Sequence, residues 1–381
     1  MPVSIEELAG PDAPAALARL RADGPVTWVP AVGGWLVTGY DQASTVMRAP
    51  ASFTVDDPRF STAQVVGASM LSVDGAEHRR HRTPFVAPFR PARVQQAFGA
   101  SVRGVAAGLV ERIRPAGRAE LRSELAGPMS VAVIAEVLGL HAVDAATVLA
   151  WYGAIVAGVT SLSAGIEPDR AAATAMANLA DHIALGLGRG SVLAAARADL
   201  PEPDVIANAA VMMFGGIETT EGMITNLALH LLTHPDVLGR LRADERLIGA
   251  AVEESLRLEP AAAVVDRYAT ADTELGGVTV RRGDLVRVSI TGANRDPSVF
   301  DDPDRFRLGR PNVRSQLSFA RGPHVCIAMD LARLETSAAI AAVLGLPDLE
   351  LESATPATGL IFRKPASLVA RWEIGQPGPP S

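Results

Sequence analysis

The residue with the clearest chemical potential is Cys326, the only cysteine in the chain. A lone cysteine excludes disulfides within the chain and zinc sites built from several cysteines. Turn-forming residues precede it, and the pattern from Met329 onward predicts a helix, so we expect the thiol where a loop enters a helix. Backbone N–H groups and the helix dipole there favour the thiolate. Cys326 is therefore a candidate axial ligand for an iron atom, and an inert core thiol is the alternative.

A second unusual stretch lies inside the long apolar helix predicted over residues 204–232. Gly215 and Gly216 each cost about 1 kcal/mol relative to alanine in a helix, but they allow a flat ligand to approach the backbone. Thr219 can bond the carbonyl of Gly215 and open the helix to water, and Glu218 places an acid beside it. The alternative is a kinked helix whose polar residues face solvent.

Two further charged pairs have helical spacing. His78 and Arg82 are four residues apart and share one helix face, although a solvated basic face is the simpler interpretation. Glu254 and Arg257 are three residues apart. On a surface such a pair contributes under about 1 kcal/mol.

The elements that must position these residues follow from their patterns. We expect helices over residues 14–22 and from Tyr40, a long loop over residues 53–70, and helices throughout residues 94–200 with breaks at 115–117, 127–128 and 165–168. Alternating segments predict three hairpins or turns, which cover residues 26–38, residues 274–290 and residues 355–362.

Bulk composition narrows the function classes. The chain is 48% hydrophobic and 20% charged, which indicates a large packed core. A formal net charge of −7 argues against general nucleic-acid binding. The N-terminus lacks a basic segment followed by an apolar run, and no uninterrupted apolar run approaches the ~18–20 residues needed to cross a bilayer. We therefore expect a soluble, cytoplasmic protein without membrane attachment.

The stretch around Cys326 resembles the haem-binding signature of the cytochrome P-450 family, Phe-x-x-Gly-x-His-x-Cys-x-Gly. Four residues stand at matching positions: Phe319, Gly322, His324 and Cys326. Ala320 stands where a glycine is common, and Ala328 replaces the final glycine. Both changes keep a small side chain and leave the ligand in place.

Other family signatures follow in the same order. Gly215, Gly216, Glu218 and Thr219 are similar to the distal-helix signature, whose acid and threonine are thought to deliver protons to dioxygen. By the same resemblance, one buried triad lies beneath the haem: Glu254, Arg257 and Arg305. A second group would neutralise the haem propionates: His78, Arg82, Arg267 and His324.

The resemblance implies a mainly α fold with a large helical lobe and a smaller β-rich lobe. Haem b would lie between the 204–232 helix and the Cys326 loop. We expect one domain over residues 1–381, with a β-rich portion near 24–40, a helical portion over 41–260 and a mixed β and haem-binding portion over 261–381.

The implied activity is that of a soluble bacterial haem-thiolate monooxygenase that hydroxylates a small apolar compound in secondary metabolism. Electrons would come from NAD(P)H through a reductase and a ferredoxin, and a carrier protein is a further candidate partner. The expected pocket walls are apolar: Met212, Met213, Phe214, Val264, Val265, Leu360 and Ile361. Ring coupling, desaturation, epoxidation and peroxide-driven oxidation stay open, although Glu218 and Thr219 together favour dioxygen. A non-enzymatic haem sensor is the distant alternative.

Overall fold

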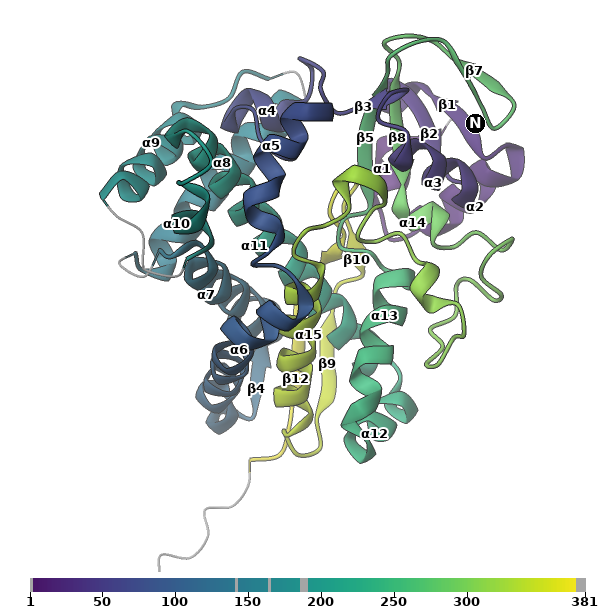
Figure 1. Ribbon diagram of the computed structural model, residues 1–381. Helices are drawn as coiled ribbons and strands as arrows, with labels where there is room; N and C mark the ends of the chain where they lie inside the picture. The colour runs from purple at the N-terminus through teal and green to yellow at the C-terminus, as the bar shows by residue number, and fades with distance from the viewer. Residues whose placement is uncertain (1–2, 141–142, 164–165, 186–190, 375–381) are drawn as a thin grey trace, which may run out of the picture.

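The computed structural model describes residues 3–140, 143–163, 166–185 and 191–374. Most of these residues form helices, and a smaller sheet-containing lobe lies to one side (Figure 1). The long helix α11, Glu202–Leu232, passes through the helical lobe as the pattern predicted.

The N-terminal lobe contains α1 and α2 and a five-stranded sheet with the order β1-β2-β8-β5-β3. β2 and β8 are parallel, and the other neighbouring pairs are antiparallel. The elements of this lobe are α1 (Ile5–Ala9), α2 (Ala13–Asp23), β1 (Val26–Val29), β2 (Gly34–Val37), α3 (Tyr40–Arg48), β3 (Phe53–Thr54), β5 (Val264–Ala269) and β8 (Leu285–Ser289). The hairpin predicted over residues 26–38 is confirmed.

The hairpin predicted over residues 274–290 was wrong in its pairing. β6 (Thr273–Leu275) pairs with β7 (Val278–Val280), and β8 instead joins the five-stranded sheet. Gly276 and Gly277 have φ values of 60° and 86°, so a tight turn closes the short hairpin before the chain reaches β8.

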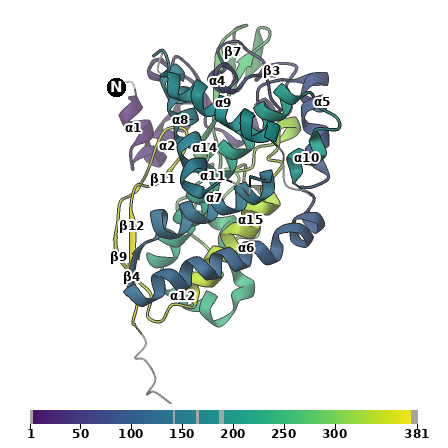
Figure 2. The same ribbon diagram turned by 90° about the vertical axis from the view of Figure 1, so that its left-hand side faces the viewer.

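The helical lobe is built around α11. The helices α7 and α15 pack against it, and α6 packs in turn on α15 and α7 (Figure 2). The helices of this lobe are α4 (Ser61–Val66), α5 (Gly75–Val86), α6 (Pro91–Ile113), α7 (Gly127–Leu138), α8 (Ala145–Ser163), α9 (Arg170–Leu185), α10 (Val192–Ala196), α12 (Pro235–Ala243), α13 (Ile248–Leu258) and α15 (Met329–Leu344). The short helix α14 (Ile290–Ala293) instead packs on α2, α3 and β5 of the N-terminal lobe. The 53–70 segment is not all loop, because it contains β3 and α4.

The C-terminal segment returns to the helical lobe as strands. β12 (Leu368–Arg371) lies between β4 (Arg118–Glu120) and β9 (Glu350–Ala354). β4 follows the helix break predicted at residues 115–117, but the strand itself was not predicted, because its partner lies about 250 residues later in the chain. β10 (Ala357–Thr358) and β11 (Lys364–Pro365) form the hairpin predicted over residues 355–362.

One helix of the described part, α8, has the length and composition of a membrane span. Its window Ala145–Leu162 has a mean hydropathy of 1.6, and 22% of the window is buried. The helix packs against α4, α7, α9 and α11. A single helix of this kind is weak evidence for membrane insertion.

Candidate functional site

Cys326 lines a cavity between α11 and the loop that leads into α15. The walls come from the segments on either side of α5, from α5, α7, α11, β5 and α15, and from the Cys326 loop. They are mainly apolar, and include Met70, Leu71, Phe89, Ile134, Val211, Met212, Met223, Val265, Phe319 and Leu331. The structure thus brings together the two stretches that the sequence singled out.

The pKa of the Cys326 thiol is shifted in the opposite direction from the one that the sequence predicted. Burial raises the pKa of the Cys326 thiol, whereas the Ala328 N–H bond and the charges of Arg82 and Arg333 act in the opposite direction. The expectation that backbone donors decide the balance in favour of the thiolate was wrong for the free thiol, because desolvation is the larger effect. The backbone donor to the sulfur is the N–H of Ala328.

The backbone of the Cys326 loop explains the two glycine-related positions. Ala320 has φ of 57°, so an alanine occupies the left-handed region where a glycine is common. Gly322 has φ of 73°, and a Cβ there would lie 2.5 Å from the carbonyl oxygen of Met47 in α3. Ala328 has φ of −97° and precedes α15, so its position does not require glycine.

Two basic side chains, Arg82 and His324, line the cavity, and His78 and Arg267 belong to the neighbouring elements α5 and β5. His78 Nε2 and His324 Nδ1 are buried and have no hydrogen-bond partner among the described residues. Arg267 is 5% exposed and donates to the carbonyl of Asp266, while Arg82 donates to the carbonyl of Val325 at 2.5 Å. A buried cation needs an anion nearby, and an unpaired buried ring nitrogen needs a hydrogen-bond partner. These residues therefore fit a haem whose two propionates they would bind.

The other ring nitrogen of His324 is fixed. Its Nε2 lies 2.7 Å from Oδ1 of Asp74, and the His78 and His324 rings are 4.3 Å apart. Burial would raise the pKa of Asp74, but bonds from His324, Thr54 and the Val55 N–H lower it to about 2. Burial and the charges of His324 and Arg82 lower the pKa of His78 to about 4.

The two glycines of α11 have different roles. A Cβ at Gly215 would meet nothing within 4 Å, so this position faces open space in the cavity. A Cβ at Gly216 would lie 2.8 Å from Cδ1 of Ile134, so this glycine also permits close packing of α11 on α7. Thr219 donates to the carbonyl of Gly215 at 2.5 Å and lines the cavity, as the sequence predicted.

Glu218 is oriented differently from its neighbour Thr219. Its carboxylate accepts from the Tyr152 hydroxyl and lies 2.7 Å from Nζ of Lys364. Glu218 is not among the residues that line the cavity in the described part of the chain. The two residues of the predicted acid–threonine pair therefore point to different surroundings.

The buried ion cluster corrects one sequence prediction. Arg257 binds both oxygens of Glu254 at 2.8 and 3.0 Å, and the second arginine is Arg310, whose Nε lies 3.1 Å from each oxygen. Arg305 is exposed and contributes its carbonyl oxygen to Arg257 and Arg310. The triad is therefore Glu254, Arg257 and Arg310, and the assignment of Arg305 was wrong.

The expected pocket walls are partly corrected. Met212 and Val265 line the cavity. Met213 is fully buried in the helical core, Leu360 packs on the N-terminal cluster around Leu17, and Ile361 is 37% exposed.

Two other expected walls also lie outside the cavity. Phe214 packs edge-on against Phe362 with ring centroids 5.4 Å apart. Val264 pairs with Ser289 in the sheet. The cavity is therefore shaped by α11 and β5 more than by the 355–362 turn.

Sequence reasoning missed two polar residues near the cavity. Glu335 of α15 is 4% exposed and lines the cavity, and its Oε2 has no partner among the described residues. Burial raises its pKa well above the ordinary value. Asn208 is fully buried in α11 and accepts from the N–H of Met70 at 2.9 Å. A charged or amide residue within an apolar helical stretch was the available signal.

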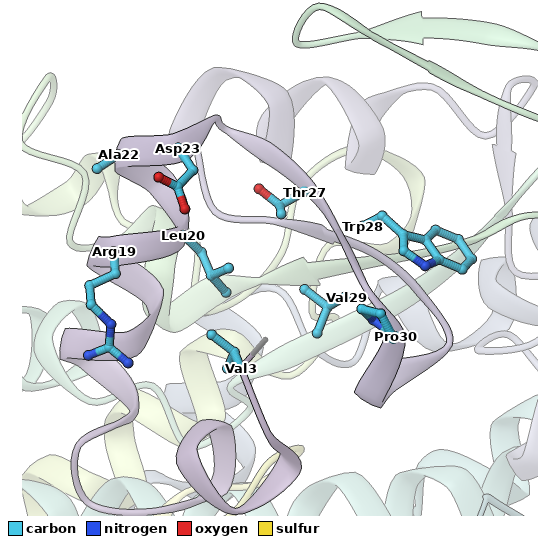
Figure 3. A pocket seen from close by; sticks show the side chains of 9 residues that line it. All are labelled: Val3, Arg19, Leu20, Ala22, Asp23, Thr27, Trp28, Val29 and Pro30. Carbon is cyan, nitrogen blue, oxygen red and sulfur yellow. The ribbon is translucent and has the colours of Figure 1, made fainter. Parts of the chain in front are cut away.

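A separate hollow of about 540 Å³ lies in the N-terminal lobe (Figure 3). Its walls include Leu20, Val29 and Trp28, and its charged residues are Arg19 and Asp23. It contains no thiol or histidine, so it lacks the residue types that make the Cys326 cavity chemically distinctive.

Comparisons with known proteins agree with this geometry. Residues 191–358 match the family model described as Cytochrome P450. The chain is 33% identical to the cytochrome P450 monooxygenase PikC of Streptomyces venezuelae, with 94% of this chain and 91% of that protein covered. It is 31% identical to the 20-oxo-5-O-mycaminosyltylactone 23-monooxygenase of Streptomyces fradiae, with 95% and 88% covered.

Solved structures show the same fold. The crystal structure of P450BioI in complex with hexadec-9Z-enoic acid ligated acyl carrier protein superposes with a TM-score of 0.85 at 29% identity, covering 95% of this chain and 98% of that chain. The mainly α fold with a smaller β-rich lobe is thereby confirmed.

Proposed function

We propose, on the premise that the chain belongs to the cytochrome P450 family of monooxygenases, that it hydroxylates a small and largely apolar compound. The observation that carries this proposal is the cavity of Cys326, whose walls are mainly apolar and include Arg82 and His324, the Nδ1 of His324 having no hydrogen-bond partner among the described residues. Similarity to the Streptomyces fradiae enzyme, named for a complex lactone, supports a secondary metabolite as substrate.

Haem b is the form of the cofactor that we propose, and when bound it would supply the activation of dioxygen. Cys326 would bind the iron, with the Ala328 N–H donating to its sulfur. His78, Arg82 and Arg267 would bind the propionates, since their polar atoms lack anionic partners among the described residues.

Proton handling is the proposed role of Glu218 and Thr219. The Thr219 hydroxyl lies at the cavity and holds its proton against the Gly215 carbonyl. Glu218 is the nearest acid in the sequence, and its carboxylate would exchange a proton with Thr219 after leaving Lys364. Electrons would reach the site from NAD(P)H through a reductase and a ferredoxin in the cytoplasm.

A substrate bound to a carrier protein is the second candidate. The observation in its favour is that the similar structure P450BioI binds a fatty acid attached to an acyl carrier protein. A spectral titration with the same acyl chain, free and carrier-bound, separates the two. Tighter binding of the carrier-bound chain supports this candidate, and equal binding contradicts it.

The first experiment is the carbon monoxide difference spectrum of the dithionite-reduced protein. We expect the red-shifted Soret maximum of thiolate-ligated haem, and we expect its loss in Cys326→Ser. A shorter-wavelength maximum in fresh wild-type protein, or no bound haem after expression with ample haem, would contradict the proposal. A ligand screen by the spin-state shift of the oxidised protein then identifies a working substrate.

A further inference from the structure

The only lysine of the chain, Lys364, lies between two carboxylates of the central helix. Its Nζ is 2.7 Å from Oε1 of Glu218 and 2.6 Å from Oε2 of Glu221. The side chains of Lys364, Glu218 and Glu221 are 11%, 13% and 11% exposed, so solvent screens these pairs only weakly. Each carboxylate also accepts a hydrogen bond from a second residue. Tyr152 donates to Glu218, and Arg122 donates to Glu221 at 2.6 Å.

The four elements that meet here are distant in sequence. Tyr152 belongs to α8, the two glutamates to α11, Lys364 to β11, and Arg122 to the π-helical turn Arg122–Ala126 before α7. Arg122 also donates to the carbonyl of Ala366 at 3.0 Å, which ties the C-terminal hairpin to the same group. The position of Glu218 therefore depends on several elements outside its own helix.

Glu218 has one cationic partner among the described residues. Tyr152 is a neutral donor, because burial and the bond to Glu218 raise the pKa of its phenol. Lys364 is thus the group that balances the charge of Glu218, whereas Glu221 has both Lys364 and Arg122.

We infer that Lys364 is a positioning residue for Glu218: it holds the carboxylate beside the Thr219 turn between proton transfers, and Glu221 retains the lysine when Glu218 turns to the cavity. Release of Glu218 does not strand a poorly exposed ammonium, because Nζ keeps its 2.6 Å contact with Glu221. Without the lysine, two carboxylates three residues apart on one helix face repel each other, and Glu218 loses its fixed position. The inference rests on the proposed role of Glu218 in the reaction.

The single lysine makes this geometry directly observable. Protein grown with lysine carrying ¹⁵N at Nζ and ¹³C at Cε gives one side-chain signal that needs no assignment. In the diamagnetic ferrous carbon monoxide complex, we expect Glu218→Gln and Glu221→Gln each to move this signal. Glu350→Gln is the matched control, since Glu350 forms an exposed pair with Arg371. A signal that neither Glu218→Gln nor Glu221→Gln moves overturns the inference.

Turnover tests the functional part, with the working substrate from the spin-state screen and a surrogate ferredoxin and reductase. We expect Lys364→Met to lower kcat about ten- to a hundredfold, as small misplacements of reacting groups do, with an unchanged ligand dissociation constant. Lys364→Arg restores the charge and should recover most of kcat. If charge imbalance unfolds Lys364→Met, the double variant Lys364→Met/Glu221→Gln carries the same prediction.

The outcomes separate the two proposals. Full kcat in Glu218→Gln refutes the role of Glu218 itself. A lowered kcat in Glu218→Gln together with wild-type kcat in Lys364→Met refutes the positioning role of Lys364 but not the role of Glu218. A loss in Lys364→Met that Lys364→Arg does not recover also refutes it, because only the charge is common to lysine and arginine.

Discussion

The buried cluster around Glu254 provides a sharp test of the structure, because the structure and the sequence motif name different arginines. We expect Arg310→Met to destabilise the protein strongly and Arg305→Met to leave its stability nearly unchanged. Arg310 is 3% exposed and donates to both oxygens of Glu254 and to the carbonyls of Asp301 and Arg305. The exposed side chain of Arg305 has no ion pair among the described residues.

The magnitude follows from what each variant leaves behind. The wild-type cluster contains one carboxylate and two guanidinium groups, so Arg310→Met leaves the Glu254–Arg257 pair neutral rather than unpaired. The loss is therefore smaller than the 3–5 kcal/mol typical of a stranded buried charge. Lost bonds to a charged group and newly unsatisfied carbonyls each cost about 1–3 kcal/mol. Arg310→Met also removes the cost of burying a second cation, which offsets part of this loss. We therefore expect the free energy of unfolding to fall by about 2–4 kcal/mol.

The assay is urea unfolding followed by tryptophan fluorescence and by loss of the Soret band. Arg305→Met should lie within about 0.5 kcal/mol of wild type, as surface substitutions generally do. Equal destabilisation by the two variants, or a larger effect of Arg305→Met, would refute the assignment of Arg310 to the cluster.

Three further changes test the surroundings of the cavity. Gly322→Ala and Gly277→Ala both impose about 1–2 kcal/mol of left-handed backbone strain, but only Gly322→Ala adds a steric clash. Gly322→Ala alone should therefore weaken the red-shifted Soret maximum of the reduced carbon monoxide complex. Equal spectra in the two variants would contradict this. Asn208→Leu removes the acceptor of the Met70 N–H, at a cost of about 1–3 kcal/mol, and hydrogen exchange there should quicken; unchanged protection argues against the bond. Because the pKa of Asp74 is lowered to about 2, its ionised carboxylate stabilises the folded state above about pH 4, and this stabilisation is lost as the pH falls toward 2. The difference in unfolding free energy between wild type and Asp74→Asn should therefore shrink over that range, and a constant difference would exclude the linkage.

Sequence reasoning located the site well where function depends on local spacing. The Cys326 loop, its following helix and the Thr219–Gly215 bond were all predicted, because each involves residues within a few positions of one another. The helix carrying His78 and Arg82 was predicted for the same reason. Their proposed roles toward the propionates stay predictions.

Predictions failed where a partner lies far along the chain. The choice of Arg305 over Arg310 depended on how the 301–310 loop folds under Glu254, and the fold places the Arg305 carbonyl there instead of its side chain. Likewise, period-2 alternation identified the strand 285–289 but not its partners, which are β2 and β5 instead of the predicted β7. Local patterns determine elements, whereas pairing depends on tertiary contacts.

The rotation of α11 about its axis illustrates this limit. The helix is apolar nearly all round, so hydrophobic periodicity predicts its existence but not which face meets the cavity. Buried polar groups make that choice, because each must find a partner. Asn208 binds the Met70 N–H, Glu218 binds Lys364, and Asn226 donates to the carbonyls of Glu259 and Arg363. Any other rotation would leave these groups unpaired at a cost of several kcal/mol in total. The apolar residues thus stabilise the packing of the helix, and the polar residues fix the face that presents Gly215 and Thr219 to the cavity.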